Sequence, residues 1–345
     1  MLKTYDKIEE EKNKEIKKNN WEVAIGLNKV DGLVPSVYLK ELVEKSINGE
    51  KTYREIEKEL HRYYENRNLT KEETNTRECD IVSTRIAELL EDGSFTFSPI
   101  YLKSIHKYLF DGVFEGDIKN YAGVFRNYNI SKKEDILNGK TVIYGNYKDL
   151  LEYLKYDFEE EENIDYAKLS KEGQVKRISK FTSAIWQVHP FIEGNTRTTA
   201  LFLIKYLKKL GFKLNEDIFI KNSLYFRNTL VISNFSDITL GISPDFKYLY
   251  SFFSKLLLNK TQKLINLEEF KENSLFFRNA LVISNFSDIN LGISPDFKYL
   301  HSFFSKLLIN KTQELINLEE FKEKVNKKTN TWEDKVNDKG NEWER

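Results

Sequence analysis

The sequence has few of the residues that build disulfide frameworks, zinc sites or glycine-dependent turns. Its 345 residues include one cysteine, four histidines, five prolines and 15 glycines. A single cysteine cannot form an internal disulfide, and the scattered histidines lack the spacing of zinc ligands. Scarce proline and glycine, beside abundant Lys, Glu, Ile, Leu and Asn, favour long helices over a turn-rich sandwich. We therefore expect a mainly α-helical protein in a reducing compartment.

The chain also lacks a net charge and an apolar run at its start. Lys and Arg total 54, and so do Asp and Glu. No overall field therefore attracts nucleic acid or an anionic membrane. Residues 1–20 are rich in Lys, Glu and Asn and have no apolar core of a cleavable signal or a membrane anchor. The sequence favours neither nucleic acid nor a membrane as a partner, and the expected location is cytoplasmic.

Apolar residues at helical spacing predict helices along most of the chain. An amphipathic pattern from Trp21 ends near Asp31-Gly32, and Ser36 and Thr52 are suitable caps for two short helices that form a hairpin. Ser98-Pro99 predicts another helix start, and residues 171–188 and 195–210 predict two more helices.

The helical period is lost between residues 121 and 147. Short extended pieces are predicted at 124–126 and 141–144, with a turn at Asn138-Gly139, so a small β-hairpin is expected here. The acidic run 157–162 suggests a solvated helix end or loop, with a metal site or a site for a basic partner as the alternative.

The C-terminal third contains an internal repeat. Asn222 to Glu272 recurs as Asn273 to Glu323, and the two 51-residue copies differ at six positions. Without a third copy or capping repeats, this indicates a recent duplication rather than a solenoid. We interpret the second copy as a redundant appendage, with a new binding surface as the alternative. Because both copies suit one docking surface, the spare copy packs against the first or swaps between molecules, and a homo-oligomer is possible.

One loop concentrates residues with catalytic chemistry: His189-Pro190-Phe191-Ile192-Glu193-Gly194-Asn195-Thr196-Arg197. Pro190 disfavours a helical conformation at His189, so the preceding helix should end there. Gly194-Asn195 permits a tight path, and Asn195 is a preferred helix cap, so backbone N–H groups should converge where the helix dipole is positive. This arrangement predicts an anion site.

The side chains of the loop complement an anion site. Arg197 offers a planar fork of donors for phosphate oxygens, and Glu193 is a hard oxygen ligand suited to Mg²⁺. His189 has a side chain that can accept a proton near neutral pH. Each residue alone is more often a solvated, core or turn residue, so the prediction depends on their combination.

Together these residues resemble the signature of the Fic family, His-x-Phe-x-(Asp/Glu)-Gly-Asn-x-Arg, at every fixed position. Residues 99–126, with Ala122-Gly123-x-x-Arg126, resemble the family segment before its flap, and 141–147 correspond to the flap. The resemblance implies the Fic/Fido helical fold with a small β-hairpin flap. It also implies a protein adenylyltransferase that uses ATP and Mg²⁺ to modify Tyr, Thr or Ser hydroxyls of a protein substrate.

The resemblance also assigns roles to residues of this chain. His189 would be the base, Phe191 the core anchor and Glu193 the Mg²⁺ ligand. The nucleotide would be bound by Gly194, Asn195, Thr196 and Arg197. The target would be held by strand addition to Val142, Ile143 and Tyr144 of the flap. The domains implied are a helical hairpin at 1–70, a Fic core at 71–221, the two copies at 222–272 and 273–323, and a polar tail at 324–345.

Two positions depart from the family pattern. Ala200 occupies the place of a second arginine that usually contacts the terminal phosphate, and Thr196 adds bulk where glycine is commoner. Two alternatives stay open. The same loop would transfer UMP, phosphocholine or a phosphoryl group, or the domain would be a non-catalytic module that binds a nucleotide or a protein.

A second resemblance lies at the N-terminus. Trp21 to Tyr64 is similar to the VbhA-type antitoxins that repress certain Fic proteins, with Leu27 and Asp31-Gly32 aligned to the pattern (Ser/Thr)-x-x-x-Glu-Gly. The resemblance implies a regulatory role for Asp31 and Gly32, although the usual partner of that acid is the position of Ala200. The lock between the acid and an arginine is therefore expected to be lost or rebuilt, and a purely structural hairpin is the alternative.

Overall fold

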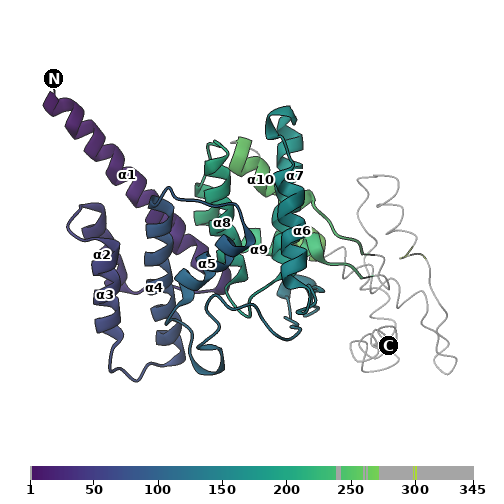
Figure 1. Ribbon diagram of the computed structural model, residues 1–345, viewed down its shortest axis with the longest axis horizontal. Helices are drawn as coiled ribbons and strands as arrows, with labels where there is room; N and C mark the ends of the chain where they lie inside the picture. Colours follow the sequence, from purple (N-terminus) through teal and green to yellow (C-terminus); the bar gives the residue numbers. More distant parts are fainter. Residues whose placement is uncertain are drawn as a thin grey trace. The chain divides into compact units, whose positions relative to one another are not determined.

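The computed structural model describes residues 2–237, 242–258, 261, 263–271, 298 and 300. The second copy of the repeat, apart from residues 298 and 300, and the tail at 324–345 lie outside the described residues. The expectation of a mainly helical protein is confirmed (Figure 1). The part of the chain that is described contains no β-strand, only a single bridge between Asp237 and Ile242.

The helices follow one another along the chain, and the longest connection lies between α5 and α6. They are α1 (Leu2–Asn28), η1 (Lys29–Asp31), α2 (Val37–Ile47), α3 (Tyr53–Tyr64), α4 (Lys71–Glu91), α5 (Pro99–Phe110), η2 (Gly116–Ile118), η3 (Asp135–Leu137), α6 (Leu150–Glu162), η4 (Tyr166–Lys168), α7 (Lys171–Val188), α8 (Asn195–Lys209), α9 (Asp217–Asn234) and α10 (Lys247–Leu258).

The chain divides into two compact units. One comprises residues 1–134, 141–234 and 245–264, and so contains all of these helices except η3. The other includes 135–140 and 235–244, where Lys140 pairs with Asp237 across 2.6 Å. The loop at 189–197 and the helices that pack around it belong to the first unit. The predicted boundary before residue 222 falls inside α9, at Asn222, where the backbone is not helical.

Helix α8 is the centre of this unit. Every residue from 195 to 207 is buried, and α1, α4, α5 and α7 pack around the helix. A helix that is covered on all sides needs apolar residues around its whole circumference, and Leu201 to Ile204 form such a run. Because α8 begins at Asn195, this packing fixes the end of the loop that precedes it.

Helix starts occur where the sequence predicts them. Ser36, Thr52 and Ser98 each accept a hydrogen bond from a backbone N–H in the first turn, and Pro99 is the first residue of α5. The predicted break after the first helical pattern is also present, since Gly32 has φ +70°. The hairpin of α2 and α3 is tied to α4 because buried Asp80 accepts hydrogen bonds from Ser36 and Tyr64.

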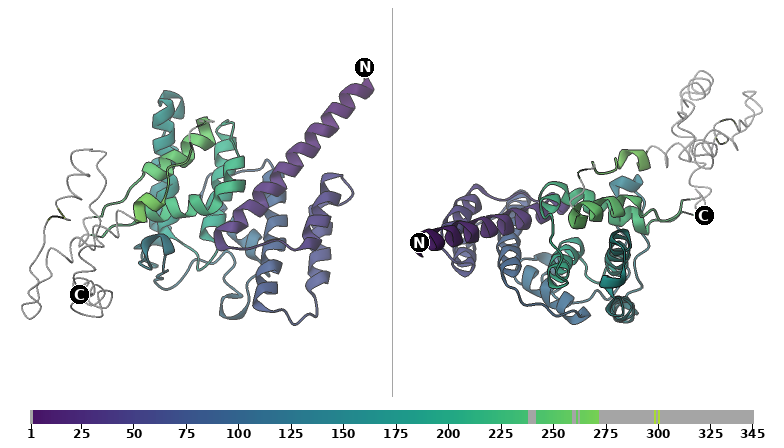
Figure 2. Two further views of the ribbon diagram at one scale, coloured as in Figure 1. Left: turned by 180° about the vertical axis from the view of Figure 1, so that it is seen from behind. Right: turned by 90° about the horizontal axis from the view of Figure 1, so that it is seen from above.

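Helix α1 packs directly on α4 and α9, although its N-terminal end extends away from the other helices (Figure 2). Trp21, Ala24 and Leu27 are fully buried. A Cβ on Gly26 would lie 2.7 Å from the Cα of Ile220, so only glycine allows this approach of α1 to α9. The part of α1 from residue 20 onward is therefore part of the core.

The acidic run 157–162 is not simply a solvated end. It forms the last part of α6, and Glu161 is buried, where it pairs with Arg177 across 2.7 Å and accepts a hydrogen bond from Tyr206. These partners join α6 to α7 and α8. No helix among the described residues has both the length and the apolar character needed to cross a membrane.

Candidate functional site

The loop begins where α7 ends, at His189. This residue has φ +47° and ψ +58°, a left-handed conformation that is uncommon outside glycine, and its N–H donates to the Trp186 carbonyl at 3.0 Å. Pro190 makes a helical conformation unfavourable at this position, so the chain turns sharply. Left-handed conformations of non-glycine residues cost about 1 kcal/mol or more and persist where the surroundings impose them.

The His189 imidazole is held in a single orientation. Its Nδ1 lies 3.3 Å from the Trp186 carbonyl, which assigns the proton to Nδ1 and leaves Nε2 as an acceptor. Nε2 is buried and has no hydrogen-bond partner among the described residues. Burial lowers the pKa of His189 well below its ordinary value, and the nearby charge of Lys132 lowers the pKa further. The ring is therefore neutral near pH 7 with a free lone pair, the form required of a general base.

Arg126 binds the backbone carbonyl groups at the start of the loop. Its buried guanidinium donates to the carbonyls of His189 and Tyr128 at 2.8 Å and also to those of Val188 and Gly145. Its backbone N–H donates to the Pro190 carbonyl at 2.9 Å. Arg126 therefore satisfies carbonyl groups at the C-terminal end of α7. The sequence motif that contains Arg126 does not indicate this role.

His106 of α5 supports the middle of the loop and was not predicted. Its ring stacks on Phe191 with centroids 3.7 Å apart and planes 9° from parallel. Gly123 N–H donates to Nδ1 at 2.8 Å, so Nε2 must carry the proton that is shared with the Glu193 carbonyl at 2.9 Å. Burial lowers the pKa of His106 to about 3, and the ring stays neutral. Phe191 is buried, as the anchoring role inferred from the family requires.

The turn into α8 requires glycine at residue 194. Gly194 has φ +76°, and a Cβ there would lie 2.4 Å from the Phe110 ring. Gly194, rather than Asn195 as predicted, is the residue that caps α8. Asn195 is the first helical residue, and its side chain accepts from the Phe191 N–H at 3.0 Å and donates to the Phe191 carbonyl at 2.7 Å. The prediction of a capping Asn195 was wrong because its amide closes the loop on itself.

The first turn of α8 keeps the character of an anion site. N–H groups in the first turn of a helix have no partner within the helix, and the dipole is positive there. The Thr196 hydroxyl points toward α7, since it accepts a hydrogen bond from Trp186 Nε1 at 3.0 Å. Its bulk therefore lies against α7, not in front of the N–H groups.

Glu193 lies at the rim of the loop, with its side chain 45% exposed and its carboxylate 2.9 Å from Lys132 Nζ. Among the described residues no group of three or more acidic, histidine or cysteine side chains is placed to hold a metal ion. One accessible carboxylate fits Mg²⁺ that takes its other ligands from phosphates and water. The residues present therefore fit a metal carried by a phosphorylated ligand rather than a resident metal.

Arg197 departs most from its expected place. Its side chain is 2% exposed, and its Nη2 lies 2.6 Å from Glu78 of α4, while Nη1 donates to Asn28 of α1 at 3.0 Å. Its Nε lies 2.8 Å from Asp31 Oδ2, close enough for an ion pair although the N–H is not aligned for a hydrogen bond. The guanidinium also lies over the Phe110 ring at 4.7 Å. Burial alone would lower its pKa, but Asp31 and Glu78 raise it.

The acid of the N-terminal segment does not face position 200. Asp31 pairs with Arg197, and Gly32 ends η1 with its N–H on the Lys29 carbonyl. In this arrangement the Arg197 guanidinium lies against α1, η1 and α4, and its Nη1 and Nη2 atoms each donate a hydrogen bond there.

The expected flap hairpin is absent, since residues 141–147 contain no strand. Its polar groups bond elsewhere: the Gly145 N–H donates to the Gln187 carbonyl, and Gln187 Nε2 donates to the Ile143 carbonyl. Val142 and Tyr144 are buried and Ile143 is 75% exposed. Of the three residues predicted to contact a target, only Ile143 has an exposed side chain.

Tyr144 instead covers His189, the candidate base. Its ring centroid lies 4.2 Å from that of His189, and its hydroxyl donates to Glu134 at 3.3 Å. Glu134 pairs with Arg227 of α9 across 2.7 Å. Arg227 belongs to the first copy of the repeat, so this copy helps to hold Tyr144 over the imidazole.

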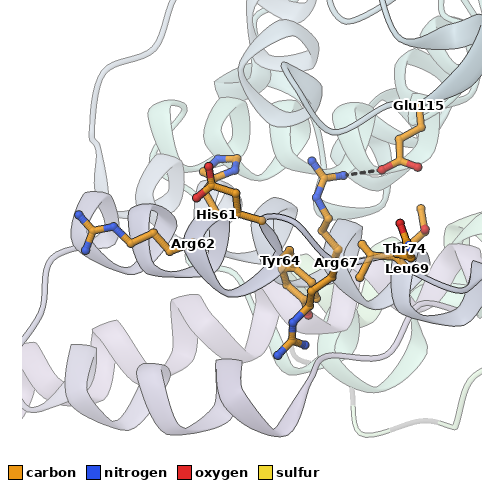
Figure 3. A pocket seen from close by; sticks show the side chains of 10 residues that line it. His61, Arg62, Tyr64, Arg67, Leu69, Thr74 and Glu115 are labelled. Atoms are coloured by element: carbon orange, nitrogen blue, oxygen red, sulfur yellow. Dashed lines mark hydrogen bonds and ion pairs between the residues drawn. The ribbon is translucent and has the colours of Figure 1, made fainter.

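A separate hollow lies between the C-terminal end of α3 and the N-terminal half of α4 (Figure 3). Its cationic lining is largely exposed, and Arg77 is already paired with Glu115 across 3.2 Å. Arg62 points away from that pair (Figure 3). No residue from 189 to 197 lines this hollow, so it does not belong to the site described above.

Comparison with known proteins defines the class of this region. Residues 96–207 match the Fic/DOC family and include the whole loop. The "Probable protein adenylyltransferase y4lH" of Sinorhizobium fredii (strain NBRC 101917 / NGR234) is 30% identical over 143 residues, which are 39% of this chain and 63% of that protein. Residues 96–207 thus match a Fic/DOC family domain, and the chain is similar to a protein named as a probable protein adenylyltransferase.

A second relative matches the chain over a smaller share of its own length. The "Ribonucleoside-diphosphate reductase small chain" of Ostreid herpesvirus 1 (isolate France) is 24% identical over 168 residues, 46% of this chain and 26% of that protein. The chain thus spans less than two thirds of the length of either relative. No solved structure matches it.

The geometry at Gly194 predicts an unusual sensitivity to a single methyl group. Gly194→Ala combines a left-handed backbone penalty of about 1 kcal/mol with overpacking of about 1–3 kcal/mol against Phe110. Gly211→Ala, beyond the other end of α8, is the matched control, because its φ is +84° and no atom lies within 4 Å of the added Cβ. In urea denaturation, Gly194→Ala should lower the free energy of unfolding by at least about 1 kcal/mol more than Gly211→Ala. Equal losses would contradict the contact.

Proposed function

We propose that the chain is a protein adenylyltransferase that transfers AMP from ATP, with Mg²⁺, to a Tyr, Thr or Ser hydroxyl of a protein substrate. The observation that carries the proposal is the His189 imidazole, which is neutral, fixed through Nδ1 and unpartnered at Nε2. This base stands at the start of a loop that ends at the N-terminus of a buried helix. The Fic/DOC match and the name of the similar protein support the proposal.

His189, Glu193 and the backbone N–H groups at the start of α8 have defined tasks in this reaction. His189 Nε2 accepts the proton of the target hydroxyl as its oxygen forms a bond to the α-phosphorus, and the bond to pyrophosphate breaks. The first-turn N–H groups of α8 and the dipole stabilise the negative charge on the phosphates. Mg²⁺ neutralises phosphate charge when bound, and Glu193 would hold it. Arg126, His106 and Asn195 keep the loop in shape, so the groups are positioned before substrate arrives.

Other donors remain candidates for a specific reason. Ala200 is fully buried and offers no cation, and the cation at residue 197 is engaged elsewhere. Contacts to the terminal phosphates of ATP are therefore fewer than the family pattern provides. A donor of UMP, phosphocholine or a phosphoryl group would need the same base and the same N–H groups. A non-catalytic binding module would have no use for the unpartnered Nε2.

The reaction is tested by following label from each donor into protein. The chain is incubated with Mg²⁺ and α-labelled ATP, γ-labelled ATP, α-labelled UTP or labelled CDP-choline, alone and with a cell lysate. We expect label from α-labelled ATP in target or self, lost on chelation of Mg²⁺ and reduced about a hundredfold or more by His189→Ala.

His61→Ala is the control for that substitution, because His61 is exposed on α3 and distant from the loop in sequence. Its labelling should equal that of the wild type. Label that survives His189→Ala would overturn the enzymatic role. Label from another donor alone would replace AMP as the transferred group.

We also propose that the N-terminal segment restrains the reaction through Arg197. Two carboxylates from different elements and one amide hold this guanidinium, and Asp31 and Asn28 both come from the segment that resembles an antitoxin. Release of Arg197 would add a cation with a planar fork of donors near the first turn of α8. The resemblance and these contacts support regulation in cis rather than a purely structural hairpin.

Point substitutions test the restraint better than truncation, because removal of α1 would expose Trp21 and its buried neighbours. Asp31→Asn keeps the shape and removes one charge, and we expect about a tenfold rise in labelling rate, equivalent to roughly 1.4 kcal/mol. Asp31→Asn with Glu78→Gln should raise it further. Asp217→Asn, at an exposed i,i+4 pair with Lys221, is the control. An unchanged or lower rate in both Asp31 variants would contradict the restraint.

A further inference from the structure

A groove of about 470 Å³ lies on the outer side of the flap segment. Its walls are residues 143–146, the side chains of Tyr153, Tyr156 and Asp157 on α6, and the last turn of α7 around Val188. The resemblance assigns Ile143 and Tyr144 to the target, and the reaction proposed above gives the groove residues of α6 and α7 no task. None of the loop residues 189–197 lines the groove. It is therefore a feature separate from the site for the donor.

The groove nevertheless adjoins the base. Val188 immediately precedes His189, and Tyr144, which lies in one wall, has its ring 4.2 Å from the imidazole. The Gly145 N–H donates to the Gln187 carbonyl at 3.1 Å, and a Cβ on Gly145 would lie 3.2 Å from both the Tyr153 ring and the Val188 carbonyl. The flap is thus fixed against α6 and α7, and Tyr144, whose ring covers His189, forms part of the groove wall.

Exposed apolar side chains surround the groove. Ile143 is 75% exposed and Tyr156 65% exposed, and Tyr153 and Leu151 are also exposed. Large apolar side chains gathered at one place on a surface are typical of protein contacts, and tyrosine is enriched in them. Both tyrosines can also cover the aliphatic stem of a long basic side chain.

Asp157 gives the groove a chemical preference. This half-buried carboxylate makes no hydrogen bond or ion pair with any described residue, because the nearby Arg177 is paired with Glu161 at 2.7 Å. Burial raises the pKa of Asp157 to about 6, and Arg177 offsets part of the rise. The groove lining contains no basic side chain that would neutralise it. Burial removes part of the hydration of this carboxylate, and a cation from a partner would replace the lost hydration with an ion pair.

The family resemblance places the target's segment along the flap, and we propose that Asp157 selects targets with a Lys or Arg in the segment that flanks the modified hydroxyl. The proposal rests on the function proposed above and names a determinant of target choice. The target's backbone would run beside the flap, its apolar side chains would contact Ile143 and Tyr156, and its basic side chain would pair with Asp157. Pairing with one sign of charge also rejects acidic segments.

Direct binding tests the groove without relying on catalysis. Fluorescent peptides with a central Tyr, and with Lys, Ala or Glu at the flanking positions, are titrated with the full-length chain and followed by anisotropy. The Lys peptides should bind roughly tenfold more tightly than the Glu peptides. Asp157→Asn should remove this preference and Asp157→Lys should reverse it, so a gain for the Glu peptides cannot arise from misfolding.

Glu160→Lys is the matched control, because Glu160 is an exposed residue of α6 outside the groove lining. It introduces the same charge change and should leave the preference intact.

The outcomes separate the two proposals. Equal binding of Lys and Glu peptides, or a preference for Lys that persists in Asp157→Lys, would overturn the assignment of the groove even where the wild type transfers AMP. A charge preference that follows Asp157, in a chain that labels nothing, would sustain the groove and overturn the enzymatic function.

Discussion

The structure depends on how one buried cation is compensated. Arg197 lies in the first turn of a helix that is covered on all sides, and an unpaired charge there would be very costly. Asp31, Glu78 and Asn28 supply the compensation, and they come from three different elements. The same network that lets α8 be buried therefore also ties the N-terminal segment to the loop.

The loop itself is held by contacts that leave its reactive atoms free. Phe110 fills the space that a side chain at residue 194 would need, and Arg126 takes up the carbonyl groups where α7 ends. His106 supports the middle of the loop, because its ring stacks on Phe191 and its Nε2 donates to the Glu193 carbonyl. Such support fixes His189 Nδ1 on a carbonyl and leaves Nε2 without a partner. The imidazole is therefore already oriented, but Tyr144 covers it and has to move before a hydroxyl can reach Nε2.

The sequence was sufficient for the features that depend on neighbours in the chain. The ends of α7 and α8, the caps at Ser36, Thr52 and Ser98, and the nine-residue loop follow from local pattern and propensity. It failed where a distant partner decides the outcome. Asn195 suits a helix cap, but Phe191 occupies its amide; residues 141–147 suit a strand, but Gln187 takes their polar groups. The partners of Arg197 lie 119 and 169 residues away, beyond any local pattern.

We propose that the docked N-terminal segment withholds Arg197 from an otherwise assembled site. The most direct measurement is a crystal structure of the full-length chain grown with Mg²⁺ and a non-hydrolysable ATP analogue. We expect Arg197 to remain on Asp31 and Glu78, with the phosphates bound by the first-turn N–H groups of α8 alone. A structure in which Arg197 contacts the phosphates while Asp31 and α1 keep their places would contradict the proposal.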